Sequence, residues 1–270
     1  MKQSIRLCIL AFTFFLVFSS NSYAESVIRL LILKHSREFM AESDANLAIN
    51  AVRRASSQGL KIKVIGNHYV DGRLVEIHYV SNPNSMKEIV DNSINDEAAK
   101  GDTLIVFTIG HGFEGGSLDN LGQRKYVMDI LAQAAAKNRQ KILWWQLSCH
   151  ACAGLPPISS LPDEQQQYFS MIASSNANEV SHSGVQGIIM EKLFVALADK
   201  NTDLDPDGRG VTTRRLSSFL RSLGYGIGSR VFSKNEEFKV FGKRVAPQIP
   251  IIDINNKQGK YDEDYVLLPD

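Results

Sequence analysis

Two cysteines and a histidine are the side chains of this sequence best suited to covalent chemistry. Cys149 and Cys152 lie three residues apart in "WWQLSCHACAG" (residues 144–154), and His111 stands between two glycines in "GHG". A thiolate is a strong nucleophile, and an imidazole takes up and returns a proton near neutral pH. A closely spaced cysteine pair can equally form a disulfide, bind a metal or exchange electrons, so the surrounding elements have to distinguish these uses.

His111 and Cys149 each come directly after an apolar segment. The segment "DTLIVFTI" (residues 102–109) precedes "GHG", and "KILWWQL" (residues 141–147) precedes "SC". Both segments have the length and composition of strands buried on both faces. Because the carboxyl ends of parallel strands meet at one edge of a sheet, we expect the thiol and the imidazole to face one cleft. The backbone N–H groups of Gly112 and Cys149 are then candidates for stabilising an oxyanion.

Strands and helices alternate along the chain. Short β-branched-rich runs predict strands, and apolar residues at helical spacing predict helices. The strands are expected at residues 27–33, 61–66, 73–80, 102–110, 141–148 and 168–175, and the helices at residues 43–55, 84–100, 124–138, 185–199 and 212–224. This order is typical of an α/β fold with a mainly parallel central sheet and helices on both faces. No linker or internal repeat interrupts it, so residues 25–270 are expected to form one domain.

The first 24 residues have the composition of a secretory signal. Lys2 and Arg6 precede an apolar run at residues 7–18, and "SYA" at residues 22–24 supplies small residues for cleavage after Ala24. The run is short for a membrane span, and an uncleaved anchor is the alternative. We expect a periplasmic or secreted protein without stable membrane insertion. The formal net charge of +1 provides no bulk attraction for nucleic acid.

The two motif blocks resemble those of the caspase/legumain-like (clan CD) cysteine peptidases. In that family an apolar strand ends in His-Gly, and after a helix a second apolar strand ends in a small residue and the catalytic cysteine. "VFTIGHGFEGG" and "KILWWQLSCHA" are similar to these blocks, and the resemblance extends over residues 27–225. It implies a caspase-haemoglobinase-like fold in an exported bacterial member. It also implies a cysteine endopeptidase for protein or peptide substrates, with His111 as general acid/base, an acyl-enzyme, and no metal or organic cofactor.

Either cysteine is a candidate for the nucleophile. Cys149 lies where its strand should end, and its "SCHA" context is similar to the metacaspase "SCHS" pattern, which favours it. Leu147, however, stands where the family usually has an acidic residue or glutamine. Cys152 fits a caspase-like "ACxG" pattern as "ACAG", but it lies one helical turn beyond the strand. We take Cys149 as the nucleophile and keep Cys152 as the alternative.

The same resemblance suggests residues for the primary specificity pocket. Arg37, after the first strand, is a candidate partner for an acidic substrate side chain, because caspase-like pockets draw on that region. Ser174, Ser175 and Asn176 are similar to the small polar residues that wall the pocket in legumain-type sequences. These four residues are the predicted substrate-binding set.

Other uses of the cysteines stay open from the sequence. Cys149 and Cys152 have the CxxC spacing of exported thiol-disulfide proteins, which act through a thiolate of lowered pKa. Together with His111 or His150 they suggest zinc, although structural zinc usually has four ligands and no second CxxC exists. The pair can also form a disulfide that silences the nucleophile until it is reduced. A catalytically inactive caspase-like binding module is the alternative of a different class.

The segment "DLDPDG" begins like a calcium-binding loop. Asp203, Asp205 and Asp207 occupy the first, third and fifth positions, but the twelfth position is Arg214 rather than a bidentate acid. We interpret the segment as an Asp/Gly-rich turn, with weak calcium binding as the alternative.

Overall fold

The computed structural model describes most of residues 28–175 of the α/β chain and short strands beyond them. The described residues are 28–58, 62–64, 68–70, 73–75, 77–94, 103–175, 177, 181, 211–212, 219, 239–240, 243–244, 251–253 and 266–268. The predicted signal segment, Asn176, the helix expected at 185–199 and the "DLDPDG" turn lie outside these residues, so those expectations stay predictions.

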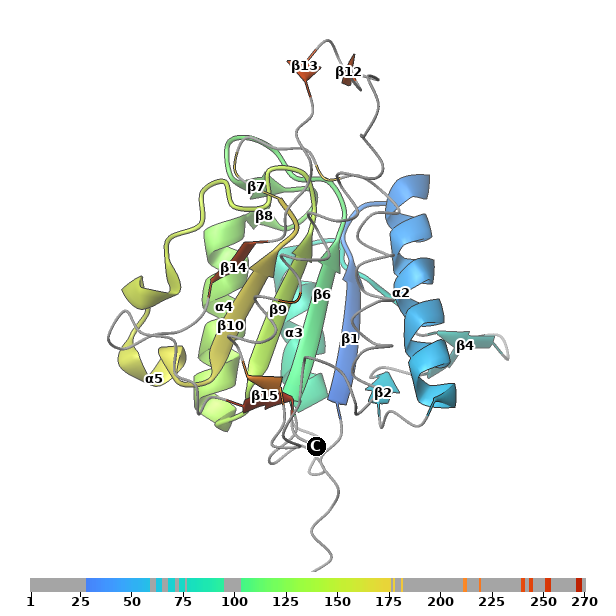
Figure 1. The fold of residues 1–270 in the computed structure, drawn as a ribbon, viewed down its shortest axis with the longest axis horizontal. Helices are drawn as coiled ribbons and strands as arrows, with labels where there is room; N and C mark the ends of the chain where they lie inside the picture. The colour runs from blue at the N-terminus through green and yellow to red at the C-terminus, as the bar shows by residue number, and fades with distance from the viewer. Residues whose placement is uncertain are drawn as a thin grey trace, which may run out of the picture.

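A seven-stranded sheet forms the centre of the fold (Figure 1). Its strands are β1 (Ile28–Lys34), β2 (Ile62–Val64), β5 (His78–Tyr79), β6 (Thr103–Ile109), β9 (Ile142–Leu147), β10 (Phe169–Ala173) and β14 (Ile251–Asp253). The order is β14-β10-β9-β6-β1-β2, with β5 pairing with the end of β1. Among these seven strands only β14 runs antiparallel to its neighbour. The mainly parallel sheet expected from the sequence is confirmed.

Helices cover both faces of this sheet. α2 (Phe39–Ser57) packs on one face against β1 and β6, whereas α3 (Pro83–Ile94) and α4 (Arg124–Asn138) lie on the other (Figure 1). The short helix α5 (Asp163–Gln166) packs against α4. Trp144 belongs to the core beneath α3 and α4, and the next residue, Trp145, points to the opposite face, where its ring centroid lies 5.2 Å from that of Phe107. Every residue of β6 and β9 is therefore buried.

The ends of α3 and α4 have recognisable capping chemistry. Before α3, Asn82 Oδ1 accepts the N–H of Ser85 at 2.9 Å, and Pro83 occupies the first helical position. α4 has the bounds expected from the sequence and is followed by Arg139 in a left-handed conformation with φ of 51°. These local signals explain why the sequence pattern located both helices.

α2 begins earlier than the sequence pattern predicts. It starts at Phe39 rather than at Ser43, because the chain turns into the helix almost directly after β1. In that turn Ser36 Oγ accepts the N–H of Glu38 at 3.3 Å. The early start places Glu38 at the carboxyl edge of the sheet.

The remaining elements are short. The strand expected at 73–80 is divided: β4 (Arg73–Val75) forms an antiparallel hairpin with β3 (His68–Val70), and β5 joins the central sheet. Other pairs are β7 (Ser117–Leu118) with β8 (Gly122–Gln123), β11 (Val211–Thr212) with β15 (Val266–Leu268), and β12 (Lys239–Val240) with β13 (Lys243–Arg244). A 3₁₀ turn spans Ile158–Ser160. Among the described helices, none is both long and apolar enough to cross a bilayer.

Candidate active site

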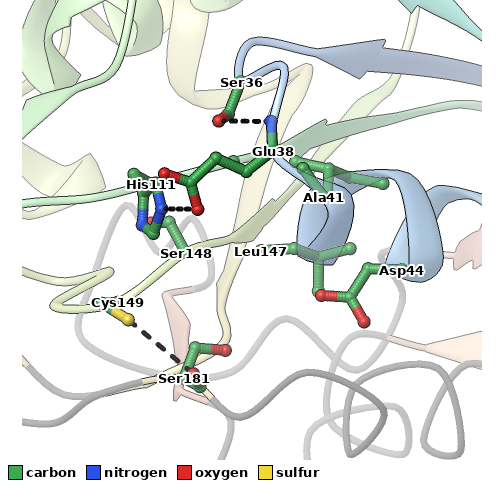
Figure 2. Close-up of a pocket in the computed structure, with 11 residues that line it drawn as sticks. Ser36, Glu38, Ala41, Asp44, His111, Leu147, Ser148, Cys149 and Ser181 are labelled. Carbon is green, nitrogen blue, oxygen red and sulfur yellow. Dashed lines mark hydrogen bonds and ion pairs between the residues drawn. The ribbon is translucent and has the colours of Figure 1, made fainter.

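Three neighbouring strands end at the same level of the sheet. Lys34 of β1 pairs with Ile109 of β6, which in turn pairs with Leu147 of β9. The loops that follow therefore leave the same edge. Figure 2 shows the cavity at this edge, to which the three loops contribute Glu38, His111 and Cys149. The other lining residues are Ser36, Ala41, Asp44, Ile109, Gly110, Leu147, Ser148 and Ser181.

His111 faces a carboxylate that the sequence analysis did not single out. Its Nε2–H donates to Oε2 of Glu38, with 2.5 Å between the two atoms (Figure 2). This contact leaves Nδ1 as the ring nitrogen that can accept a proton. Both side chains are well exposed, at 44% and 59%, so the pair contributes little to stability and matters for orientation. The sequence signal that could have found Glu38 is its position shortly after the first strand, at the same sheet edge as His111 and Cys149.

The Cys149 thiol is half-buried in the cavity. Its sulfur lies 3.7 Å from the backbone carbonyl oxygen of Ser181, within reach of a weak S–H hydrogen bond. Burial raises the pKa of the Cys149 thiol, and a backbone hydrogen bond with Ser181 and then the positive charge of Arg124 oppose that rise. The thiol is therefore protonated at neutral pH, and a nucleophilic attack by its sulfur needs a base.

Two buried serines hold the peptide group that precedes Cys149. Ser174 Oγ accepts the N–H of Ser148 at 3.2 Å and donates to its carbonyl oxygen at 2.9 Å, and Ser175 Oγ donates to the same oxygen at 3.3 Å. The Ser148 carbonyl and the Cys149 N–H belong to one planar peptide group, so these contacts set the direction of that N–H. Both serines are fully buried and lie outside the cavity lining. They support the Cys149 loop, and their contact with substrate stays a prediction.

Arg37 also lies outside the cavity lining. Its side chain is exposed, and its guanidinium carbon lies 4.9 Å from the ring centroid of Tyr79 in a cation–π contact. Binding of an acidic substrate side chain by Arg37 stays a prediction.

The backbone at Gly112 lies too close to the Cys149 loop for any side chain. A Cβ atom at Gly112 would lie 2.1 Å from Nη2 of Arg124 and 2.3 Å from the carbonyl oxygen of Cys149. In the described chain, the N–H groups of Gly112 and Cys149 donate to no backbone carbonyl of a turn or loop. Two such N–H groups on adjoining loops are what an oxyanion site requires, and their use in one stays a prediction.

A second histidine is buried directly below the His111 loop. His35 Nδ1 donates to the carbonyl oxygen of Asp119 at 2.9 Å, and the His35 ring occupies the space that a side chain at Gly110 would need. Its Nε2 atom is buried without a hydrogen-bond partner among the described residues. Burial lowers the pKa of His35 from 6.5 to about 4, so the ring is neutral at pH 7.

The folded protein is expected to lose stability as the pH falls from 6.5 to about 4. The unfolded chain protonates His35 near its ordinary pKa, whereas the folded chain does so only near pH 4. The stability is therefore complete above pH 6.5 and declines by about 3 kcal/mol through this window. Urea unfolding between pH 8 and pH 4 measures the decline. A His35→Asn variant should be less stable at pH 8 but should lose less on acidification, and equal losses in both proteins would contradict the assignment.

The two cysteines have different surroundings. Cys149 and Cys152 are not joined by a disulfide, and Cys149 lines the cavity of His111 whereas Cys152 does not. Within the described ranges, no group of three or more His, Cys, Asp or Glu side chains is arranged to hold a metal ion. His150 instead directs Nδ1 to the carbonyl oxygen of Ala177 at 2.9 Å. The geometry thus favours Cys149 as the partner of His111.

Comparison with known proteins places the fold. No protein-family profile matches the sequence, and no curated protein sequence is similar to it. Caspase-1 from Spodoptera frugiperda has a similar structure, with a TM-score of 0.53 and 13% identity over 87% of this chain and 92% of that chain. A pro-sf-caspase-1 structure gives a TM-score of 0.47 and 10% identity over 86% and 92% of the two chains.

This protein therefore has a caspase-like α/β fold, and the fold class expected from the sequence is confirmed. At 13% identity the likeness concerns the fold alone. One fold supports many functions, so the chemistry has to be argued from the cavity at the edge of the sheet.

Proposed function

We propose that this protein is a cysteine endopeptidase that hydrolyses peptide bonds through Cys149 and His111. The observation that carries the proposal is that both side chains follow adjacent parallel strands, β6 and β9, and line one cavity. A thiol and an imidazole in the same cavity, with the imidazole held by a carboxylate, are the groups that nucleophilic acyl transfer requires: a nucleophile, a base and a group that orients the base. The proposal includes export to the periplasm or out of the cell and a protein or peptide as substrate.

In the proposed reaction the Cys149 sulfur attacks the carbonyl carbon of the scissile peptide bond. The thiol proton moves to Nδ1 of His111, whose Nε2–H stays bonded to Glu38, and the carbonyl oxygen becomes an oxyanion. The C–N bond then breaks, His111 protonates the departing amine, and a thioester remains on Cys149. A water molecule that loses a proton to His111 cleaves the thioester, which releases the acid and restores the thiol.

Glu38 and the loop backbone complete this scheme. The Glu38 carboxylate orients the imidazole and stabilises the positive charge that His111 carries after it accepts the thiol proton. The N–H groups of Gly112 and Cys149 are the proposed oxyanion donors. The two buried serines on the preceding carbonyl keep the Cys149 N–H in one direction.

The environment of the thiol disfavours a thiol-disulfide exchange protein. Such proteins act through a thiolate whose pKa is lowered, whereas burial raises the pKa of Cys149. Thiol-disulfide exchange through such a thiolate also does not require a paired histidine and carboxylate such as His111 and Glu38. A raised thiol pKa suits a peptidase in which a base removes the thiol proton during the attack.

Replacement of His111 by alanine is expected to slow peptide hydrolysis by about 10²- to 10⁴-fold, the usual contribution of a general acid/base. The purified protein is incubated under reducing conditions with a diverse peptide mixture, and the new chain ends are identified by mass spectrometry. His150→Ala is the matched control, because His150 is a half-buried histidine of the Cys149 loop that lies outside the cavity lining.

Cleavage by the parent and by His150→Ala, but not by His111→Ala, supports the proposal. Equal hydrolysis rates for His111→Ala and the parent would show that His111 is not the general acid/base. A folded parent that cuts no peptide points to a binding module, and one that only reduces insulin disulfides points to an exchange protein.

A further inference from the structure

A buried arginine joins the two loops that carry the reactive side chains. Arg124 is the first residue of α4 and is fully buried. Its Nη1 donates to the carbonyl oxygens of Phe113 at 2.9 Å and Ala153 at 3.3 Å, and its Nη2 donates to the carbonyl oxygen of Cys149 at 2.7 Å. Phe113 belongs to the His111 loop, and the other two acceptors belong to the Cys149 loop. One guanidinium therefore sets the distance between both loops.

The third nitrogen of this guanidinium is also engaged. With the Gln146 amide oxygen towards Arg124, that oxygen accepts from Nε at 2.6 Å, and the amide nitrogen donates to the Ala151 carbonyl at 3.0 Å. All described acceptors of Arg124 are thus neutral oxygens. Burial lowers the pKa of Arg124 to about 10, which leaves the side chain cationic at neutral pH. Burying a cation that has no carboxylate among its described partners is costly, and its charge is only weakly screened from the groups around it.

The position of this charge relative to the thiol follows from the same contacts. Nη2 is bonded to the carbonyl of Cys149 itself, and it lies where a side chain at Gly112 would have to go. The Cys149 thiol contacts the Ser181 carbonyl and is influenced by the charge of Arg124 from α4, and Cys152 of the same loop also interacts electrostatically with Arg124. His111 lines the same cavity and is itself paired with Glu38. Among these residues, Arg124 is cationic at neutral pH, and all of its described hydrogen-bond acceptors are neutral oxygens.

We infer that Arg124 is a positioning residue of this site, which locks the His111 and Cys149 loops together and holds its positive charge against the backbone of Cys149. It touches neither substrate nor sulfur directly and acts through the backbone of both loops and through its charge. Its effect on turnover rests on the proposed peptidase function, whereas its effect on the thiol does not.

Two substitutions separate the charge from the geometry. Arg124→Gln removes the charge, and Arg124→Lys keeps the charge but cannot bond to carbonyls on both loops in the same way. The matched control is Arg29→Gln, because Arg29 is also buried but lies near the start of β1, at the opposite end of the strand from the site. All variants are made in a Cys152→Ala chain without residues 1–24, in which Cys149 is the single cysteine.

The first readout is the rate of iodoacetamide alkylation of Cys149 as a function of pH. Arg124→Gln is expected to raise the apparent thiol pKa by about one unit or more, so that alkylation at pH 7 slows by about tenfold. In Arg124→Lys and Arg29→Gln, the Cys149 thiol should titrate as it does in the parent. The second readout is kcat and KM with a cleaved peptide, for which Arg124→Lys should lower kcat by about 10- to 100-fold with little change in KM.

The outcomes separate this inference from the proposed function. A folded Arg124→Gln protein whose thiol titrates like the parent overturns the inference, whether or not the parent is a peptidase. If Arg124→Gln does not fold, the test rests on Arg124→Lys. A kcat of Arg124→Lys equal to that of the parent overturns the inference. A raised thiol pKa in Arg124→Gln, in a parent that cuts no peptide, supports the inference and contradicts the peptidase.

Discussion

Replacing Cys149 by alanine is expected to abolish peptide hydrolysis, with a loss on the order of 10⁴-fold or more in kcat/KM. The thiol supplies the sulfur that forms the acyl-enzyme, and Cys152, the other cysteine in the described part of the chain, does not line the cavity. His111 and Glu38 remain in place in this variant but have no nucleophile to deprotonate. The loss should appear in kcat rather than in KM, because the missing bond forms only during the reaction.

Cys152→Ala is the matched control for this experiment. Cys152 lies in the same loop and is also half-buried, so its replacement tests the loss of a thiol at nearly the same place. We expect it to retain hydrolysis and to be labelled by an acyl-trapping inhibitor, which Cys149→Ala should not be. Labelling of Cys149→Ala, with none of Cys152→Ala, would show that Cys152 is the nucleophile. Comparison with and without reductant in the parent shows whether a disulfide between the two silences the site.

Gly112→Ala is expected to reduce activity by about 100-fold and to destabilise the fold by about 1–3 kcal/mol. The added Cβ would meet the Cys149 carbonyl oxygen at 2.3 Å and the Arg124 guanidinium at 2.1 Å. Neither group can move freely, since they are bonded to each other and Arg124 is fully buried. The His111 loop must therefore shift away from the Cys149 loop, which separates the two reactive side chains.

Gly115→Ala provides the comparison for Gly112→Ala. Gly115 is exposed in the same loop, and a Cβ atom there would meet nothing within 4 Å. We expect parental activity from it and a change in unfolding free energy of less than about 1 kcal/mol. Urea unfolding and kcat/KM measured on both variants give the two quantities. Equal activity of Gly112→Ala and Gly115→Ala would show that the loops do not need this close approach.

Much of the fold was predictable because its signals are local. The apolar runs before His111 and Cys149 predicted strands β6 and β9, and the bounds of α4 followed from helical spacing alone. The parallel arrangement then predicted that both strand ends reach one edge. The division of the segment at 73–80 into β4 and β5 was missed, because alternation of apolar and polar residues does not reveal where a chain leaves one sheet for another.

The sequence by itself thus determined the α/β class and the side chains, His111 and Cys149, whose chemistry suits an acyl transfer. Only the tertiary structure decided which groups serve them. Glu38 lies 73 residues from His111 along the chain, and Arg124 lies 25 residues from Cys149. Arg124 has the local sequence of an ordinary helix start, yet it is buried between two loops. The physical reason is that strand order and loop packing create these contacts, and neither leaves a periodic pattern in the sequence.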